Sequence, residues 1–295
     1  MKKFIILIPV YNDWKSVFRL IENIDLKIVN WDAHVSVFIV NDSSTETLTK
    51  TKIKINNIKK INILNMKNNR GHARCNAAGL KYLIEKENFD YVILMDGDGE
   101  DRPEELSLLF EKCKENPSKM ITANRVKRSE GFFFRSLYVC HKILTYLFTG
   151  KLIKFGNYSC IPKELVTKLV GDASLWSSFS GTVTKVISNR TSISSIRGKR
   201  YFGPSQMNLY NLLIHSLSII AVFRKSVIKR SIIFIIFYFF FVFKNLSIIT
   251  FLPILIILIF IFSIFRISQR ENSDELDNSL KNIQSTDTLD SSNSG

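Results

Sequence analysis

Cysteine and histidine are too few and too scattered in this sequence to suggest a disulfide scaffold or a clustered metal centre. The 295 residues include four cysteines, Cys75, Cys113, Cys140 and Cys160, with no C-x-x-C pair among them. The four histidines show neither H-x-x-x-H nor H-E-x-x-H spacing. We therefore expect free, reduced thiols and assign no histidine to the functional site.

No cleavable leader is expected at the N-terminus. The short apolar run from Lys3 to Val10 is followed by Tyr11, Asn12 and Asp13, with no small-residue cleavage site before them. We interpret this run as a first strand, buried on both faces of a sheet. The catalytic part of the chain is then expected in the cytoplasm.

Charge is nearly absent from Ser231 to Phe265, where 35 residues include one charged side chain, Lys244. A stretch of this length is typical of a membrane protein. Basic residues flank it, in the cluster Arg224 to Arg230 and at Arg266, so both flanks are expected in the cytoplasm. The sequence predicts a multi-pass hairpin, whose short first arm either crosses with snorkelling basic residues or re-enters.

The net charge of +15 is uneven, because the residues from Glu271 onward carry −5 and residues 1–270 carry +20. Such an excess suits an anionic partner. Beside an apolar stretch, an anionic membrane surface or a phosphorylated substrate is favoured over nucleic acid. The polar, acidic C-terminal end is expected to be disordered.

Strand-like and helix-like patterns alternate along the first hundred residues. Apolar runs of strand length occur at Lys3–Val10, His34–Val40, Ile61–Leu64 and Tyr91–Met95, and helical spacing occurs at Ser16–Ile24 and Gly71–Glu85. This alternation predicts an α/β fold with an open, mostly parallel sheet. Leu209 to Phe223 is expected to form an amphipathic helix against the core or the bilayer surface.

Polar residues follow each predicted strand. The four turns contain Tyr11-Asn12-Asp13, Asn41-Asp42-Ser43-Ser44, Asn68-Asn69-Arg70-Gly71 and Asp96-Gly97-Asp98-Gly99-Glu100-Asp101. Ligands of open α/β sheets bind beyond the carboxyl ends of the strands, so these turns define the candidate site. The spaced carboxylates of the last turn suit Mg²⁺ or Mn²⁺, which commonly bridges to a diphosphate.

These motifs resemble the GT-A catalytic domain of glycosyltransferase family 2, and within it the polyprenyl-phosphate glycosyltransferases of the dolichol-phosphate mannose synthase type. IPVYND is similar to the family's nucleobase-binding opening, IVNDSS to V-D-D-x-S, and NNRGHARCNAAGL to N-x-G-x-x-x-A-x-N-x-G. LMDGDGEDRPEEL resembles D-A-D-L-Q-D-P-P-E, and RYFGPSQ resembles R-x-x-G-x-S-K. The resemblance covers residues 3–207 and is strongest in the first half.

The resemblance implies a nucleotide-sugar site and a metal at the sheet edge. Donor binding is assigned to Pro9, Tyr11, Asn12, Asp42, Arg70, Gly71 and Asp96. The metal, Mg²⁺ or Mn²⁺, is assigned to Asp96, Asp98 and Glu100. The catalytic residues are Asp98, Arg200, Arg125 and Arg135, whose arginines would neutralise the departing diphosphate of a UDP- or GDP-sugar.

Two departures from the family pattern concern the acceptor. Gln206 stands where the family has lysine, and Phe155 to Pro162 replaces D-x-x-x-G-F-R without its arginine. The Q-x-x-R-W signature of processive synthases is absent, which favours transfer of one sugar per encounter.

The need for a general base depends on the acceptor. A lipid phosphate is already largely ionised at neutral pH, whereas a hydroxyl acceptor requires a base. Asp101 or Glu104 is the nearest candidate, and each also suits helix capping. Trp176 is expected in the core or beside an acceptor groove.

Three functional hypotheses follow. The preferred one is a membrane-anchored, metal-dependent inverting glycosyltransferase that transfers a single sugar from a nucleotide-sugar to a polyprenyl (undecaprenyl or dolichyl) phosphate. The second keeps the donor but transfers to a sugar hydroxyl of a cell-surface glycan or glycolipid. The third is a non-catalytic membrane subunit with the same fold, which the intact carboxylates and Arg200 disfavour. The donor sugar and a homo-oligomeric state stay open.

The sequence accordingly divides into four parts. A catalytic domain is expected over residues 1–207, followed by an amphipathic interfacial helix and basic cluster over 208–230. Two transmembrane segments are expected to form a hairpin over 231–267. A disordered acidic tail is expected over 268–295.

Overall fold

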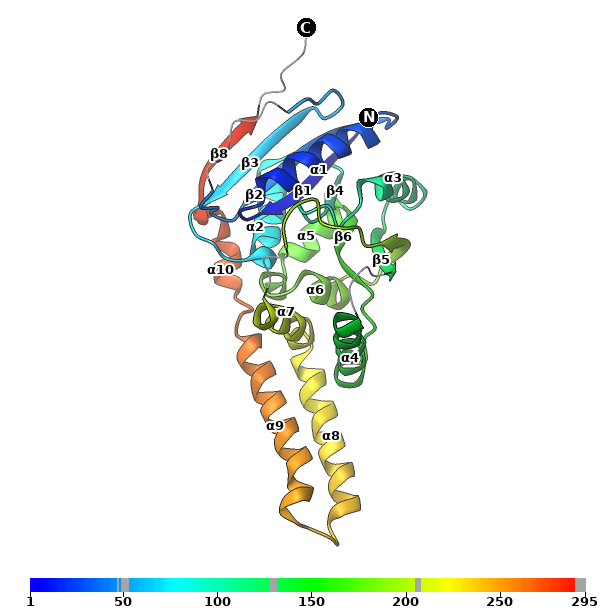
Figure 1. The fold of residues 1–295 in the computed structure, drawn as a ribbon, viewed down its shortest axis with the longest axis vertical. Helices are drawn as coiled ribbons and strands as arrows, with labels where there is room; N and C mark the ends of the chain where they lie inside the picture. The colour runs from blue at the N-terminus through cyan, green and yellow to red at the C-terminus, as the bar shows by residue number, and fades with distance from the viewer. Residues whose placement is uncertain (47, 49–52, 128–131, 205–207, 290–295) are drawn as a thin grey trace.

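A mixed sheet of eight strands forms the centre of the molecule (Figure 1). The computed structural model describes residues 1–46, 48, 53–127, 132–204 and 208–289. The strands are β1 (Lys2–Val10), β2 (Ala33–Asn41), β3 (Lys60–Met66), β4 (Tyr91–Leu94), β5 (Met120–Lys127), β6 (Phe155–Pro162), β7 (Arg190–Ile196) and β8 (Ile283–Leu289). Their order across the sheet is β7-β5-β6-β4-β1-β2-β3-β8. The predicted α/β class is confirmed.

The central strands β4, β1, β2 and β3 run parallel to one another. β1 pairs with β2 along its whole length, from Lys2 opposite Ala33 to Val10 opposite Asn41. β6 runs antiparallel to both β4 and β5, which makes the sheet mixed. Because the parallel strands end at the same edge, the polar turns after β1, β2, β3 and β4 are brought together there.

Helices cover both faces of this sheet. They and the intervening 3-10 turns are α1 (Trp14–Lys27), α2 (His72–Lys86), η1 (Pro103–Glu105), α3 (Leu106–Glu115), α5 (Lys163–Val170), η2 (Ala173–Trp176) and α6 (Phe179–Val186), whereas α4 (Phe132–Thr149) packs outside these two layers. Phe4, Ile6 and Ile8 of β1 pack in one apolar cluster with α1 and α3. Ile5 and Leu7 pack in the opposite cluster with α2, α5 and α6. Burial on both faces explains why β1 is apolar at consecutive positions.

Three further helices lie away from the sheet, near α4: α7 (Leu209–Ala221), α8 (Arg224–Val242) and α9 (Ile248–Ser268), of which α8 and α9 form a two-armed projection (Figure 1). Within the described residues, one helical segment is long and apolar enough to cross a membrane, Ile248–Asp277, which contains α9 and has 6% of its apolar stretch buried.

The second crossing that the sequence predicts is not supported by α8. Four of the first seven residues of α8 are basic, and 12 apolar or uncharged residues remain, from Ser231 to Val242. At about 1.5 Å per residue, this remainder spans about 18 Å, whereas the hydrocarbon core of a bilayer is about 30 Å thick.

The acidic tail is ordered as far as Leu289, so the prediction of disorder over 268–295 is wrong for the described part of it. α10 (Ser273–Asp277) and η3 (Ser279–Asn282) lead back to the sheet, where β8 pairs antiparallel with β3 (Figure 1). Leu276 is 2% exposed in the cluster that includes α2. One buried leucine and a ladder of backbone hydrogen bonds thus order a segment whose composition is polar. Residues 290–295 lie outside the described residues.

The tail is therefore expected to contribute to stability. Leu276→Ala should lower the free energy of unfolding by about 2 kcal/mol or more, because it removes buried methyl groups and leaves a cavity. Thermal unfolding of the full chain in detergent measures this effect. Gln284→Ala, at an exposed position of β8, is the matched control and should change the free energy by less than about 0.5 kcal/mol. Equal behaviour of the two variants would contradict the structural role of the tail.

Candidate active site

Side-chain hydrogen bonds join the four polar turns at the sheet edge. Asn12, after β1, accepts the backbone N–H of Thr45 at 2.9 Å, in the turn after β2. Asp42, at the end of β2, accepts the backbone N–H groups of Arg70 and Gly71, each at 2.8 Å, in the turn after β3. His72 at the start of α2 and Asp96 after β4 are joined at 3.0 Å between Nε2 and Oδ1. The predicted convergence of the turns is therefore observed.

Asp42 holds the loop before α2 in place. Its side chain is 3% exposed, and both of its carboxylate oxygens are occupied by the N–H groups of Arg70 and Gly71. Gly71 has φ +88°, a left-handed conformation that favours glycine. The carboxylate of Asp42 thus binds the protein backbone. Tyr11, another of the predicted donor-binding residues, is 40% exposed at the edge of the sheet.

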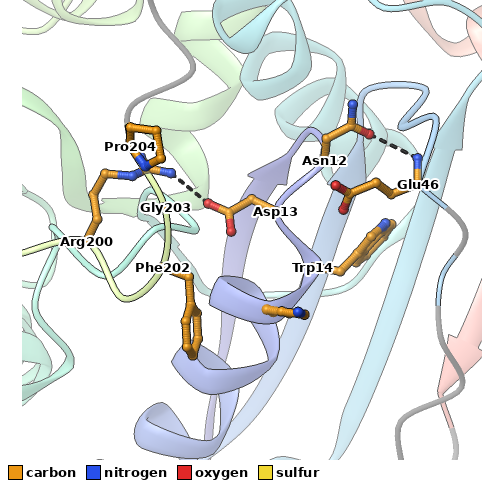
Figure 2. A pocket seen from close by; sticks show the side chains of 9 residues that line it. Asn12, Asp13, Trp14, Glu46, Arg200, Phe202, Gly203 and Pro204 are labelled. Atoms are coloured by element: carbon orange, nitrogen blue, oxygen red, sulfur yellow. Dashed lines mark hydrogen bonds and ion pairs between the residues drawn. The ribbon is translucent and has the colours of Figure 1, made fainter.

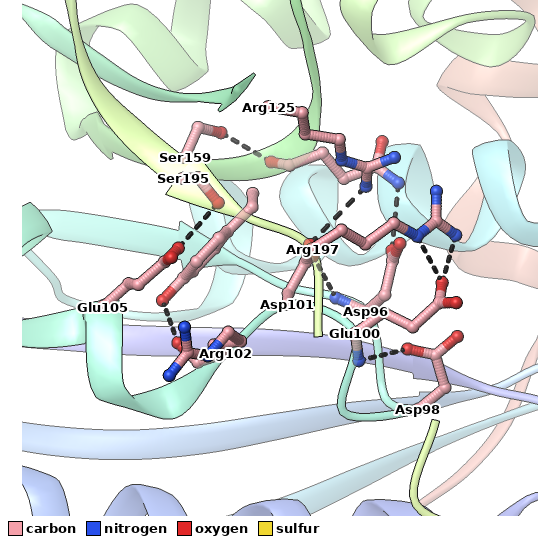
Figure 3. Close-up of polar contacts among 12 residues, drawn as sticks. Asp96, Asp98, Glu100, Asp101, Arg102, Glu105, Arg125, Ser159, Ser195 and Arg197 are labelled. Carbon is pink, nitrogen blue, oxygen red and sulfur yellow. Dashed lines mark hydrogen bonds and ion pairs between the residues drawn. The ribbon is translucent and has the colours of Figure 1, made fainter. Parts of the chain in front are cut away.

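The turn after β4 gathers four carboxylates, which we call the acidic turn: Asp96, Asp98, Glu100 and Asp101 (Figure 3). Asp98 Oδ1 accepts the backbone N–H of Glu100 at 2.9 Å, and Asp101 Oδ2 accepts that of Asp96 at 2.9 Å. Gly99, with φ +89°, lies under the ring of Tyr201, and a Cβ atom there would approach the ring to 2.6 Å. The conformation of the turn is therefore fixed by its own hydrogen bonds and by the ring of Tyr201 packed against it.

The segment from Arg197 to Tyr201 covers the acidic turn. Arg200 Nη1 lies 2.6 Å from Asp98 Oδ2, and its Nη2 lies 2.7 Å from Asp13 Oδ2. Arg197 forms an ion pair with Glu100 (Figure 3). Backbone bonds reinforce the contact, because Tyr201 N donates to the Asp98 carbonyl at 2.9 Å. Arg200 thereby links the turn after β1 to the turn after β4.

The other two predicted arginines differ in position. Arg125 of β5 lies beside the acidic turn, with Nη2 3.6 Å from Asp101 Oδ1. Arg135 belongs to α4, and its side chain lies outside the described residues. Gln206, whose departure from the family pattern bears on the acceptor, lies outside them as well. Trp176 is 3% exposed, which places it in the core.

The acidic turn carries an excess of negative charge. Burial, together with the charges of Asp96 and Glu100, raises the pKa of Asp98 to about 6. Burial and the charge of Asp96 raise the pKa of Asp101 to about 7. At Asp96 the effect of burial is outweighed by His72, whose charge and hydrogen bond lower the pKa of Asp96. Asp96 in turn outweighs burial at His72 and raises the pKa of the imidazole. Such a turn favours a bound cation.

A pocket of about 180 Å³ lies next to the acidic turn, between the start of α1 and the segment that follows Arg200 (Figure 2). It is lined by Asn12, Asp13, Trp14, Lys15, Glu46, Arg200, Phe202, Gly203 and Pro204. Figure 2 shows the Asp13–Arg200 ion pair at its wall. Arg200 therefore faces both a pocket with an aromatic lining and the carboxylates.

The donor set fits Mg²⁺ or Mn²⁺ in chemistry, because carboxylate oxygens are the ligands that these cations prefer. The predicted trio is not assembled, however. Glu100 faces Arg197, and no three acidic, histidine or cysteine side chains are grouped as a ready metal site within the described part of the chain. Mg²⁺ is commonly held by one or two carboxylates together with substrate phosphates. Asp96 and Asp98 fit that type of site.

Sequence reasoning missed several residues of the site. His72, which the sequence prediction left out of the site, is bonded to Asp96. Asn157 Nδ2 donates to the same Asp96 oxygen at 3.0 Å, and Arg197 pairs with Glu100. His72 directly follows Gly71 of a motif that the sequence analysis identified, and this position could have indicated its place in the site. Arg197 lies three residues before Arg200 but outside any motif, and nothing local identified Asn157.

Asp101 and Glu104 do not cap the helix that follows. Asp101 is 4% exposed and its Oδ2 is bonded to the Asp96 N–H. Glu104 pairs with Arg102 at 3.4 Å, and neither η1 nor α3 has a side-chain cap. The capping alternative is therefore wrong for both residues.

Comparison with known proteins supports the predicted family and fold. The chain is similar to the undecaprenyl-phosphate 4-deoxy-4-formamido-L-arabinose transferases of Salmonella choleraesuis (strain SC-B67) and Salmonella newport (strain SL254), with 25% identity over 223 residues in each case. The matched part covers 72% of this chain and 66% of each relative. The chain thus spans just under two thirds of their length.

Two solved structures share its architecture. The mannosyl-3-phosphoglycerate synthase of Rubrobacter xylanophilus matches with a TM-score of 0.55 at 14% identity, over 78% of this chain and 74% of that one. The glucosyl-3-phosphoglycerate synthase of Mycobacterium tuberculosis, crystallised with Mn²⁺, UDP-glucose and phosphoglyceric acid, matches with a TM-score of 0.53 at 13% identity, over 77% and 80% of the two chains. The predicted GT-A fold is confirmed.

Residues 5–166 match the family model described as Glycosyl transferase family 2. The match spans more than half of the chain and includes the turns after β1, β2, β3 and β4. It ends before the segment from Arg197 to Tyr201, which the structure adds to the same site. The protein therefore belongs to glycosyl transferase family 2 and is a glycosyltransferase.

Proposed function

We propose that this glycosyltransferase is attached to a membrane, depends on a divalent cation, and transfers one sugar from a UDP- or GDP-sugar to a polyprenyl phosphate at the cytoplasmic face. The observation that carries this proposal is the packing of the apolar helix α9 against the catalytic domain. Similarity to undecaprenyl-phosphate sugar transferases supports the choice of acceptor.

α9 is docked on the domain through a shared apolar cluster. Ile264 and Ile267 of α9 are 2% and 8% exposed, and they pack with Ile220 of α7 and Val227 of α8. Leu144 of α4 adds to the same cluster. Burial of several aliphatic side chains contributes about 1.5–3 kcal/mol for each. The apolar projection is therefore held in a defined place on the domain.

One of these helices, α7, lies near the acidic turn. His215 of α7 interacts electrostatically with Asp96, His72 and Arg125. A polyprenyl phosphate carries its phosphate at the headgroup level of a bilayer, where a domain docked on α9 would present this turn. Attachment to the membrane would let the enzyme meet its lipid acceptor by diffusion along the membrane surface rather than through the solution.

The residues of the turn have distinct tasks in the proposed reaction. Asp96 and Asp98 would hold Mg²⁺ or Mn²⁺, which when bound supplies positive charge for the departing diphosphate. Arg200 and Arg125 would bind phosphate oxygens, because guanidinium groups form paired hydrogen bonds with phosphate. Arg200, which is paired with Asp98 and Asp13 in this structure, would exchange those ion pairs for the phosphate. His72 and Asn157 keep Asp96 ionised and fixed in orientation.

The burial of Asp101 favours an acceptor that needs no base. Its Oδ2 accepts the Asp96 N–H, its Oδ1 lies 3.6 Å from Arg125 Nη2, and the residue is 4% exposed, so a substrate hydroxyl has little access to it. A phosphate monoester with a second pKa of about 6 is largely ionised at neutral pH and attacks without deprotonation. A lipid phosphate therefore suits this site better than a sugar hydroxyl.

The acceptor is tested with membranes that contain the full chain. They are incubated with labelled nucleotide-sugars, with and without added polyprenyl phosphate, and with a hydroxyl-bearing glycolipid as the comparison. Label should enter the organic phase only when the lipid phosphate is present. Transfer to the glycolipid alone would overturn the proposal.

Asp98→Asn should lower the rate of transfer at least about 100-fold, because the lost charge on the metal side of the site costs several kcal/mol in the transition state. The variant should keep the melting temperature of the wild type within a few degrees. Asp32→Asn, at an exposed position before β2, is the matched control with normal activity. Full turnover of Asp98→Asn, or of the wild type after chelation, would exclude the metal role.

Metal binding should weaken as the pH falls through about 6. The pKa of Asp98 is raised to about 6, so its carboxyl is protonated below that pH and ionised above it. Protons then compete with the cation for the same oxygen atoms. The increase in melting temperature caused by Mn²⁺ should be large at about pH 8 and small at about pH 5. An equal increase at both values would contradict the role of Asp98.

A further inference from the structure

Three arginines lie where α9 returns to the catalytic domain; we call them the arginine cluster. Arg70 ends the loop before α2, Arg74 lies in the first turn of α2, and Arg270 follows α9. α10, which begins at Ser273, packs against α2 and η2, so the end of α9 is held near the start of α2 (Figure 1). Burial and the charges of Arg270 and Arg70 lower the pKa of the Arg74 guanidinium.

Arg74 is fixed in position by the returning tail. Its guanidinium lies over the ring of Trp176, 5.5 Å from the centroid. The indole Nε1 of Trp176 donates a hydrogen bond of 2.7 Å to Glu275 Oε2 in α10. A cation over an indole face is attracted by the ring and loses little conformational freedom when a further ligand binds.

Within the part of the chain that the structure describes, the arginine cluster has no direct ion-pair partner, although Glu275 and Asp42 act electrostatically on Arg74. The acids that act on Arg74 are already engaged, Glu275 with Trp176 and Asp42 with two backbone N–H groups. Among the described residues, the buried Nε of Arg74 has no hydrogen-bond partner, a state that costs free energy.

We propose that the arginine cluster binds the phosphate group of a lipid at the membrane surface. Guanidinium groups recognise phosphate through paired, charge-assisted hydrogen bonds. Arg270 lies two residues after the end of α9 at Ser268, so the cluster would lie near the level of the headgroups if α9 is inserted. This inference rests on the membrane attachment in the proposed function. The phosphate belongs either to the polyprenyl acceptor or to an anionic phospholipid of the bilayer.

Lipid binding to the full chain in detergent tests this site without donor or turnover. Native mass spectrometry measures the affinity for a short-chain phosphatidylglycerol, with the diacylglycerol that lacks the phosphate as the comparison. The wild type should prefer the phospholipid, and the double variant Arg74→Gln/Arg270→Gln should bind it about tenfold more weakly or worse, the equivalent of one lost charge-assisted bond. Equal affinity of the wild type for both lipids, or of the double variant and wild type for phosphatidylglycerol, would overturn the proposal.

Two further variants separate recognition from folding. Lys168→Gln removes one positive charge from an exposed position of α5 and should bind as the wild type does. Arg74→Lys keeps the charge but loses the planar fork, and an intermediate affinity is expected. Melting temperatures show whether each variant is folded. If Lys168→Gln weakened binding as much as the double variant does, net charge alone would explain the effect, and a specific site would be refuted.

A soluble prenyl phosphate distinguishes the two sources of the phosphate. If it displaces phosphatidylglycerol from the wild type, the cluster takes the acceptor, and the double variant should raise KM for the acceptor with little change in kcat. If it does not, the cluster takes a bilayer phospholipid. A wild type that binds phosphatidylglycerol through the cluster but never transfers sugar to a lipid phosphate would refute the proposed function and leave this site in place.

Discussion

Repulsion among carboxylates at the end of β4 is the constraint on which the site depends. Four of the six residues from Asp96 to Asp101 are acidic, and burial raises the free energy of each charge. The surrounding structure offsets this cost with one cationic partner for each region of the turn. These partners come from α2, β5 and the segment after β7, as His72, Arg125, Arg197 and Arg200. The turn therefore ties together parts of the chain that are more than a hundred residues apart.

α2 connects this charge balance to the membrane end of the molecule. Its first residue, His72, pairs with Asp96, and two residues later Arg74 lies over Trp176. Trp176 is bonded to α10, the segment that follows α9. One turn of helix thus contacts both the catalytic carboxylates and the return from the apolar projection. A shift of the projection relative to the domain would therefore change the contacts at the start of α2.

The local features of the sequence predicted the central sheet and the polar edge, because strand burial and turn composition are set by neighbouring residues. Lys3 to Val10 and the turn from Asp96 to Asp101 are examples. Contacts between distant segments were not predictable in this way. Arg197 carries no pattern of its own and acquires a role only when β7 pairs with β5 and delivers it to Glu100. The tail was misjudged for the same reason, since its polar composition gives no indication that Leu276 is buried.

The antiparallel pairing of β8 with β3 makes the apolar projection an insertion within the catalytic domain rather than an appendage at its end. During synthesis, β3 emerges more than two hundred residues before its edge partner. Until then its backbone N–H and C=O groups present an open edge that can pair with other chains. The edge strand is translated only after α8 and α9, so completion of the sheet is coupled in time to the placement of the projection. Chains interrupted before residue 283 retain that open edge and are candidates for aggregation.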